Sequence, residues 1–190
     1  HRGKVHDAHA YVGAAAEAGA RVAIVEREVD APAALSLIRV AATLPALGDL
    51  ARAHADRWRA RGGRKLIGIT GSAGKPPTRV AAAAVLELGT SEKGEIAELS
   101  RIARPGVGIL TLVAEAHLEG LGTVEGVAHE KDALLRSLPR EGIAIGNADD
   151  ARVSRLVDAA PCDRRITYGR HEAAPLRITD RAPLRLALYA

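Results

Sequence analysis

The stretch KLIGITGSAGKPPT, residues 65–78, decides the fold class. Its first six residues are mostly apolar and rich in isoleucine, which predicts a buried β-strand over residues 65–70. The glycine-rich segment that follows predicts a turn from this strand into a helix. Such a turn points backbone N–H groups at a phosphate, and a lysine placed there reaches the outer phosphates of a nucleotide. The candidate phosphate loop comprises Gly71, Ser72, Ala73, Gly74 and Lys75.

The same stretch departs from the usual phosphate-loop spacing, G-x-x-x-x-G-K-[ST]. Ile69 stands five positions before Gly74, where the first glycine is usual, and Pro76 replaces the serine or threonine after the lysine. Pro76 and Pro77 also lack the backbone N–H groups that bind phosphate. We therefore expect weakened ATP affinity, and a glycine-rich turn without a ligand is the alternative interpretation.

Strands and helices alternate from about residue 61 onward, which predicts an α/β fold with a parallel sheet and flanking helices. Earlier in the chain the pattern predicts a helical stretch over 9–20, short strands over 21–26 and 37–40, and a long helix over 43–63. In the second part we expect strands over residues 65–70, 85–89, 107–113 and 164–169, and a strand running into a turn over residues 142–150. We expect helices over residues 94–106, 123–139 and 151–160. The Gly62–Gly63 pair predicts a boundary between a first domain, 1–61, and a second, 62–190.

The amino-acid composition limits the classes of binding partner that we expect. The 190 residues carry a net charge of +4, which favours anionic partners such as nucleotides or acidic metabolites. Aromatic residues make up 2% of the chain, too few for the stacking surface of a typical single-strand nucleic-acid binder. The single cysteine, Cys162, cannot form an internal disulfide and indicates an intracellular protein. No apolar run reaches the length of a membrane span.

A series of motifs follows the loop in order: ELG at 87–89, GEIAEL at 94–99, AEAHLEG at 114–120, AHEKDALL at 128–135 and NADD at 147–150. Together with TGSAGK they resemble the central domain of the Mur ligase family, most closely its members that add D-alanyl-D-alanine. The resemblance implies an incomplete P-loop-containing central domain over 62–190. It also implies that residues 1–61 are a remnant of the family's small N-terminal α/β domain, which binds the UDP-substrate.

The resemblance implies a reaction as well. Mur ligases of this type use ATP and Mg²⁺ to convert a carboxylate of UDP-N-acetylmuramoyl-tripeptide into an acyl phosphate, which the amine of D-alanyl-D-alanine then attacks. The setting would be peptidoglycan precursor synthesis in the bacterial cytoplasm. The family's C-terminal ligase domain has no counterpart in these residues, and the sequence starts at His1 rather than Met, so we expect a fragment with impaired activity. A non-catalytic nucleotide-binding or interaction module derived from such a ligase is the alternative.

Matching this sequence to the family's motifs, residue by residue, gives the expected site residues. The resemblance makes Lys75 and Lys131 catalytic, Glu87 and His117 metal ligands, and Lys131 a further metal ligand when CO₂ has carbamylated it. Asn147, at the start of NADD, becomes a weaker candidate for nucleotide contact. Without the family each has a plainer interpretation: Glu87 as a loop carboxylate, His117 as a surface histidine, and Lys131 as part of an exposed charged helix face. The NADD segment also fits a turn with an aspartate as helix N-cap.

Two departures from the family pattern affect these expectations. Leu112 stands where the family usually has asparagine. The segment 76–83 is also short, because eight helical residues rise about 12 Å while the preceding strand would be about 20 Å long. We therefore expect a shortened helix, an extended connection, or a strand 85–88 that pairs elsewhere, for example in another chain. An incomplete core also predicts self-association.

Overall fold

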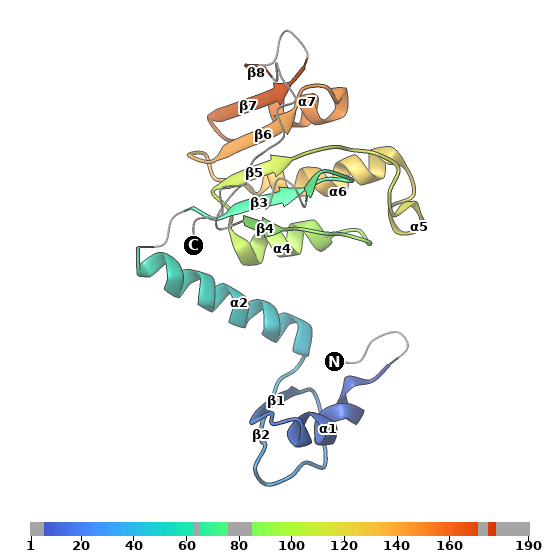
Figure 1. Ribbon diagram of the computed structural model, residues 1–190, viewed down its shortest axis with the longest axis vertical. Helices are drawn as coiled ribbons and strands as arrows, with labels where there is room; N and C mark the ends of the chain where they lie inside the picture. Colours follow the sequence, from blue (N-terminus) through green and yellow to red (C-terminus); the bar gives the residue numbers. More distant parts are fainter. Residues whose placement is uncertain (1–5, 63–64, 76–84, 171–174, 178–190) are drawn as a thin grey trace, which may run out of the picture. The chain divides into compact units, whose positions relative to one another are not determined.

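A computed structural model describes residues 6–62, 65–75, 85–170 and 175–177 of the chain (Figure 1). The chain forms two compact units, His1–Trp58 and Arg59–Ala190. The short connection expected between the first two strands of the sheet, including Pro76 and Pro77, lies outside the described residues. Among the described helices, none has both the length and the apolar character needed to cross a membrane.

The first unit is built around a two-stranded parallel sheet. Its elements are the 3-10 helix η1 (Ala8–Tyr11), α1 (Val12–Glu17), β1 (Val22–Val25), β2 (Ser36–Arg39) and most of α2 (Thr43–Ala60). The two strands pair in parallel, and the buried core residues are Val12, Val25 and Leu35. The short strands expected over 21–26 and 37–40 are therefore confirmed, each within one residue at either end.

A polar network joins the elements of this unit. The buried His9 contacts Asp7 through Nδ1 at 2.6 Å, and its Nε2 accepts a hydrogen bond from the backbone N–H of Glu26 at 2.9 Å. The Glu26 carboxylate in turn accepts hydrogen bonds from both the N–H and the hydroxyl of Thr43, each at 2.7 Å. Glu26 thus satisfies a free donor at the start of α2, the role that an N-cap side chain usually has.

The second unit is a six-stranded parallel sheet with helices, as the alternation predicted. The strands occur in the order β4-β3-β5-β6-β7-β8, and every neighbouring pair is parallel. Their bounds are β3 (Ile67–Thr70), β4 (Val85–Glu87), β5 (Val107–Leu110), β6 (Ile143–Asn147), β7 (Arg164–Gly169) and β8 (Leu176–Arg177). Because β4 pairs with β3 of the same chain, the suggestion that it pairs in another chain is wrong.

The helices of this unit are α4 (Glu95–Ala103), α5 (Leu118–Leu121), α6 (Val124–Arg136) and α7 (Ala151–Asp158). The connections β4 to β5, β5 to β6 and β6 to β7 all step across the sheet in the same direction, so right-handed crossovers place their helices on one face. Accordingly α6 packs against α4 on one side and α7 on the other (Figure 1).

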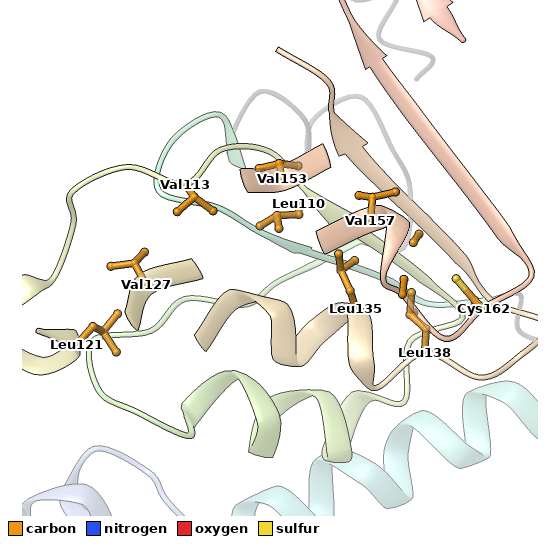
Figure 2. Packing of buried hydrophobic residues seen from close by; sticks show 11 residues of the cluster. Leu110, Val113, Leu121, Val127, Leu135, Leu138, Val153, Val157 and Cys162 are labelled. Atoms are coloured by element: carbon orange, nitrogen blue, oxygen red, sulfur yellow. The ribbon is translucent and has the colours of Figure 1, made fainter. Parts of the chain in front are cut away.

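Glycines in the strands let these helices approach the sheet closely. Gly68 of β3 and Gly108 of β5 are register partners, and both lie under the buried Leu134 of α6. A Cβ atom on Gly68 would lie 2.8 Å from Leu134 Cδ1. The main core then extends from the end of β5 across α6 to α7, as Figure 2 shows for Leu110, Val113, Leu135, Val153 and Val157.

One predicted strand ends earlier than expected, for a physical reason. The strand predicted to continue to residue 113 ends at Leu110, because the next residues turn to bond the loop 71–75. The strand running into a turn that was predicted over 142–150 is confirmed, since β6 ends at Asn147 and Asp150 is the N-cap of α7. The aspartate cap expected in NADD is thereby confirmed. Thr123 is the N-cap of α6, and its hydroxyl accepts from Gly126 N–H at 3.1 Å.

Candidate functional site

The loop Gly71–Lys75 leaves the carboxyl end of β3 with a backbone that requires glycine. Gly71 and Gly74 have φ angles of 155° and 83°. A Cβ atom on Gly71 would lie 1.9 Å from the hydroxyl oxygen of Thr111, which leaves no room for a side chain. The glycines therefore set both the curvature of the loop and its close approach to the end of β5.

Hydrogen bonds fix this loop to the segment after β5. Ser72 N–H donates to the carbonyl of Leu112 at 2.7 Å, and the Ser72 hydroxyl bonds both the carbonyl and the N–H of Ala114 at 3.0 Å. The Thr111 hydroxyl donates to the carbonyl of Ala73 at 2.5 Å. Ser72, a candidate phosphate ligand, thus uses its hydroxyl within the protein. Leu112 contributes its backbone carbonyl where the family usually has an asparagine.

The structure brings Lys75 and Lys131 together. Lys75 Nζ donates to the carbonyl of Gly71 at 2.5 Å, which keeps the ammonium beside the loop. Lys131, on α6, is 2% exposed. Burial, and to a lesser extent the Lys75 cation, lower the pKa of Lys131 to about 8, while Glu130 acts in the opposite direction. Within the described part of the chain, no carboxylate forms an ion pair with Lys131, so the amine loses its proton near pH 8.

The interpretation of this part of α6 as an exposed charged face is wrong. Glu130, Lys131 and Asp132 are 5%, 2% and 3% exposed. Helix α6 lies between α4 and α7 and also contacts the sheet, so three consecutive side chains meet protein in different directions. Glu130 bonds the start of α4, Lys131 is close enough to Lys75 for the Lys75 cation to lower its pKa, and Asp132 pairs with Arg136 of its own helix.

Glu87 and His117 lie at the same edge of the sheet but in separate surroundings. Glu87 is exposed at the carboxyl end of β4, in register with Ile69 of β3, and so lies on the side of the sheet where the loop 71–75 emerges. His117 is also exposed and precedes α5 with φ 55°, a left-handed conformation that is uncommon outside glycine. It lines a pocket of about 620 Å³ together with Ser91, Glu92, Leu118, Glu119 and Gly120.

A carboxylate network lies beside His117. The N–H groups of Ser91 and Glu92 hold the pKa of Glu95 below its usual value, and His117 is a lesser cause. Within the described residues, no three histidine, cysteine or acidic side chains are grouped to hold a metal ion. Glu87, His117 and carbamylated Lys131 as Mg²⁺ ligands therefore stay a prediction.

Asn147 ends β6 and is used for the following turn. Its Oδ1 accepts from Asp149 N–H at 3.0 Å. Asp150 then accepts from the N–H groups of Arg152 and Val153, and its other oxygen accepts from Val113 N–H at 2.8 Å. A pocket of about 860 Å³ borders this turn, lined by Ala148, Asp149, Ala151, Ser154, Arg155, Thr167 and Arg170. The plainer interpretation of NADD is confirmed, and a nucleotide contact of Asn147 stays a prediction.

Two residues at this edge, Thr111 and Thr70, were missed from the sequence. The Thr111 hydroxyl bonds the carbonyl of Ala73 in the phosphate loop. Thr70, fully buried at the end of β3 directly before the loop, has a hydroxyl that finds no hydrogen-bond partner among the described residues. Each is a polar residue at a strand end, and that position was the available signal. The glycine loop and the adjacent Lys75 fit a phosphate group, and the Glu87 carboxylate is an oxygen donor of the kind that a nucleotide-bound Mg²⁺ accepts.

Comparisons with known proteins agree with this arrangement. Residues 65–184 match the Mur ligase middle domain. The chain is 32% identical to UDP-N-acetylmuramoyl-tripeptide–D-alanyl-D-alanine ligase of Bacillus subtilis, covering 88% of this chain and 43% of that enzyme. The ligase of the same name from Mycobacterium bovis is 31% identical, covering 97% of this chain and 47% of the enzyme.

Solved structures give the same result. MurF from Acinetobacter baumannii matches with a TM-score of 0.76 and 27% identity, over 88% of this chain and 44% of that one. MurF ligase from Thermotoga maritima in complex with ADP matches with a TM-score of 0.74 and 25% identity, over 90% and 46% of the two chains. The chain thus spans less than half the length of these relatives. Its phosphate-loop sheet, its motif order and its matched middle domain show that the chain belongs to the Mur ligase family.

Proposed function

We propose that this chain provides the ATP-binding part of a ligase that adds D-alanyl-D-alanine to UDP-N-acetylmuramoyl-tripeptide. The observation that supports this most is the glycine loop hydrogen-bonded to the segment after β5, with Lys75 beside the loop and close enough to Lys131 to lower the pKa of Lys131. A glycine-rich loop with a cationic lysine beside it suits the transfer of a phosphoryl group.

In the proposed reaction a carboxylate oxygen of the tripeptide attacks the γ-phosphorus of ATP, and ADP leaves. The amine of D-alanyl-D-alanine then attacks the acyl carbon of this acyl phosphate, releasing inorganic phosphate and a proton. Gly71–Lys75 would hold the phosphates in line, and Lys75 would turn from the Gly71 carbonyl to the transferring group. Bound Mg²⁺ would neutralise phosphate charge, with Glu87 and His117 as its proposed ligands.

Lys131 is proposed to act after carbamylation. A neutral amine attacks CO₂ to form a carbamate and releases a proton, and the new carboxylate is an oxygen ligand of the kind that Mg²⁺ prefers. The lowered pKa of Lys131 supports this step, because the neutral amine is available near pH 8. The negative carbamate would also relieve the repulsion between the two lysines.

The domain roles follow from the same proposal. Residues 1–61 would be the remnant of the UDP-substrate-binding domain, and residues 62–190 the incomplete central domain. The D-alanyl-D-alanine site and the closing of the ATP site would need the remainder of the ligase. The protein would act in the bacterial cytoplasm.

The proposal is tested by titrating the chain with Mg·ADP in a calorimeter. We expect Lys75→Ala to weaken binding at least tenfold, because a charge-assisted contact to phosphate is lost. Lys65→Ala is the matched control, since Lys65 is an exposed lysine before β3 whose ammonium bonds the carbonyl of Glu141. Equal affinity of both variants would contradict a phosphate role for Lys75.

A phosphate-release assay with ATP, UDP-N-acetylmuramoyl-tripeptide and D-alanyl-D-alanine separates the two functions. Release that Lys75→Ala abolishes would support a ligase. Binding of Mg·ADP without release would favour the nucleotide-binding module. A chain that binds no nucleotide would overturn both.

A further inference from the structure

Glu130 is a buried carboxylate that the proposed reaction leaves without a role. It is 5% exposed on α6. Its Oε2 accepts a hydrogen bond from Gly94 N–H at 2.7 Å, and its Oε1 accepts from Ile96 N–H at 2.8 Å and from the Thr90 hydroxyl at 3.5 Å. All three donors belong to one segment, which connects β4 to the first turn of α4.

Helix α4 has no N-cap side chain of its own. Its N-cap is Gly94, which has no side chain and a φ angle of 90°. Glu130 supplies from another helix the acceptor that serine or aspartate usually supplies locally, and its negative charge suits the positive end of the helix. Glu95 fixes the preceding residues, because its Oε2 accepts from Ser91 N–H at 2.7 Å and from Glu92 N–H at 3.1 Å.

The same segment forms one wall of the pocket that contains His117. Ser91 and Glu92 line this pocket from one side, and His117 and α5 line it from the other. The two sides are in close contact, since a Cβ atom on Gly120 would lie 2.1 Å from the carbonyl oxygen of Ser91. A shift of the segment therefore changes the surroundings of His117.

We propose that Glu130 is a positioning residue that holds the wall of the His117 pocket through Gly94 and Ile96. It precedes Lys131 in the chain, so one helix would order both the amine beside the phosphate loop and the pocket of the proposed metal ligand. An effect of Glu130 on catalysis rests on the proposed function. Its effect on the His117 pocket does not.

Asp132 offers a matched control. It is a buried carboxylate two residues further along the same helix, 3% exposed, and it pairs with Arg136 of that helix. Glu130→Gln keeps the size of the side chain but leaves one acceptor oxygen for two N–H groups, and Asp132→Asn makes the equivalent change. A general loss of stability would affect both variants alike.

The test compares the two variants in the full chain by NMR. In Glu130→Gln we expect amide hydrogen exchange at Gly94 and Ile96 to rise at least tenfold relative to β6 amides, and the His117 imidazole signals to shift. In Asp132→Asn neither should change. Unchanged His117 signals in Glu130→Gln would overturn the proposal, leaving only a helix cap, and so would equal changes in both variants.

A second measurement separates this inference from the proposed function. Binding of Mn²⁺ is followed by electron paramagnetic resonance at saturating ADP. We expect Glu130→Gln to weaken Mn²⁺ binding about fivefold and Asp132→Asn to leave it unchanged, because His117 is displaced only in the former. If the unaltered chain binds no Mn²⁺ with ADP, the proposed function fails, while amide exchange and the His117 signals still decide the role of Glu130.

Discussion

Lys131 places an amine where a positive charge is destabilised by burial and by a second lysine. Its pKa in the folded chain is about 8, against 10.5 for an unperturbed lysine. Below pH 8 the amine is protonated in both the folded and the unfolded chain. The full free-energy penalty for burying its charge therefore lowers the stability of the folded chain. Between pH 8 and 10.5 the unfolded chain binds more protons, so the penalty falls as pH rises.

Replacing this amine should therefore stabilise the chain at neutral pH. We expect Lys131→Met to raise the free energy of unfolding by about 2 kcal/mol at pH 7 in CO₂-free buffer, and the gain to shrink as the pH approaches 10.5. Urea denaturation of both proteins at pH 7 and pH 10 measures the difference, in which the titration of other groups cancels. A variant that is less stable than the parent at pH 7 would show that the ammonium is well solvated or paired.

Residues that sequence reasoning found and residues that it missed differ in how far along the chain their interaction partners lie. Gly71 and Gly74 could be predicted, because a glycine-rich turn after a strand is a local pattern with a local cause. Asp150 could be predicted as a cap for the same reason. Glu130 could not, since its donors lie 34 to 40 residues earlier in the chain and a charged residue on an amphipathic helix normally indicates solvent. The pairing of Lys75 with Lys131 came from the family resemblance rather than from either residue.

At the scale of elements, the contact between β6 and α7 depends on a glycine in the strand. A Cβ atom on Gly146 would lie 2.5 Å from Val157 Cγ2 and 2.6 Å from Val153 Cγ1. Valine methyl groups on a helix have little rotamer freedom, so the helix itself would have to move. The strand's existence was predictable from its β-branched residues, but this dependence on Gly146 was not, because nothing local in the sequence specifies which helix side chains meet the strand.

Gly146→Ala should therefore destabilise the second unit by about 2 kcal/mol. Gly89→Ala is the control, because Gly89 has open space around its Cα and a backbone conformation that other residues adopt. Thermal unfolding of the two variants measures the effect, and the double variant Gly146→Ala, Val157→Ala should recover part of the loss. Equal melting temperatures for the two glycine variants would mean that α7 adjusts without cost.

At the scale of the whole molecule, the chain has separate cores. The first unit has the small cluster of Val12, Val25 and Leu35, and it leaves Val22, Leu37 and Ile38 exposed. The second has two clusters of fully buried side chains around α6. The alternation of strands and helices predicted the core of the second unit. The short predicted strands of the first unit gave no indication of how little apolar surface they bury. A two-stranded sheet with so small a core has limited stability.

The two units should consequently unfold independently, and each core can be tested by one truncation. We expect Val25→Ala, which costs about 2 kcal/mol, to accelerate amide exchange in β1 and β2 while leaving β5 and β6 unchanged. Leu134→Ala should accelerate exchange in β3 and β5 and leave β1 unchanged, because Leu134 packs against Leu88, Ile96 and Gly68 of the second unit. Exchange that rises in both units with either variant would instead mean one cooperative structure, and the proposed division into a substrate-binding remnant and a nucleotide-binding domain would lose its physical basis.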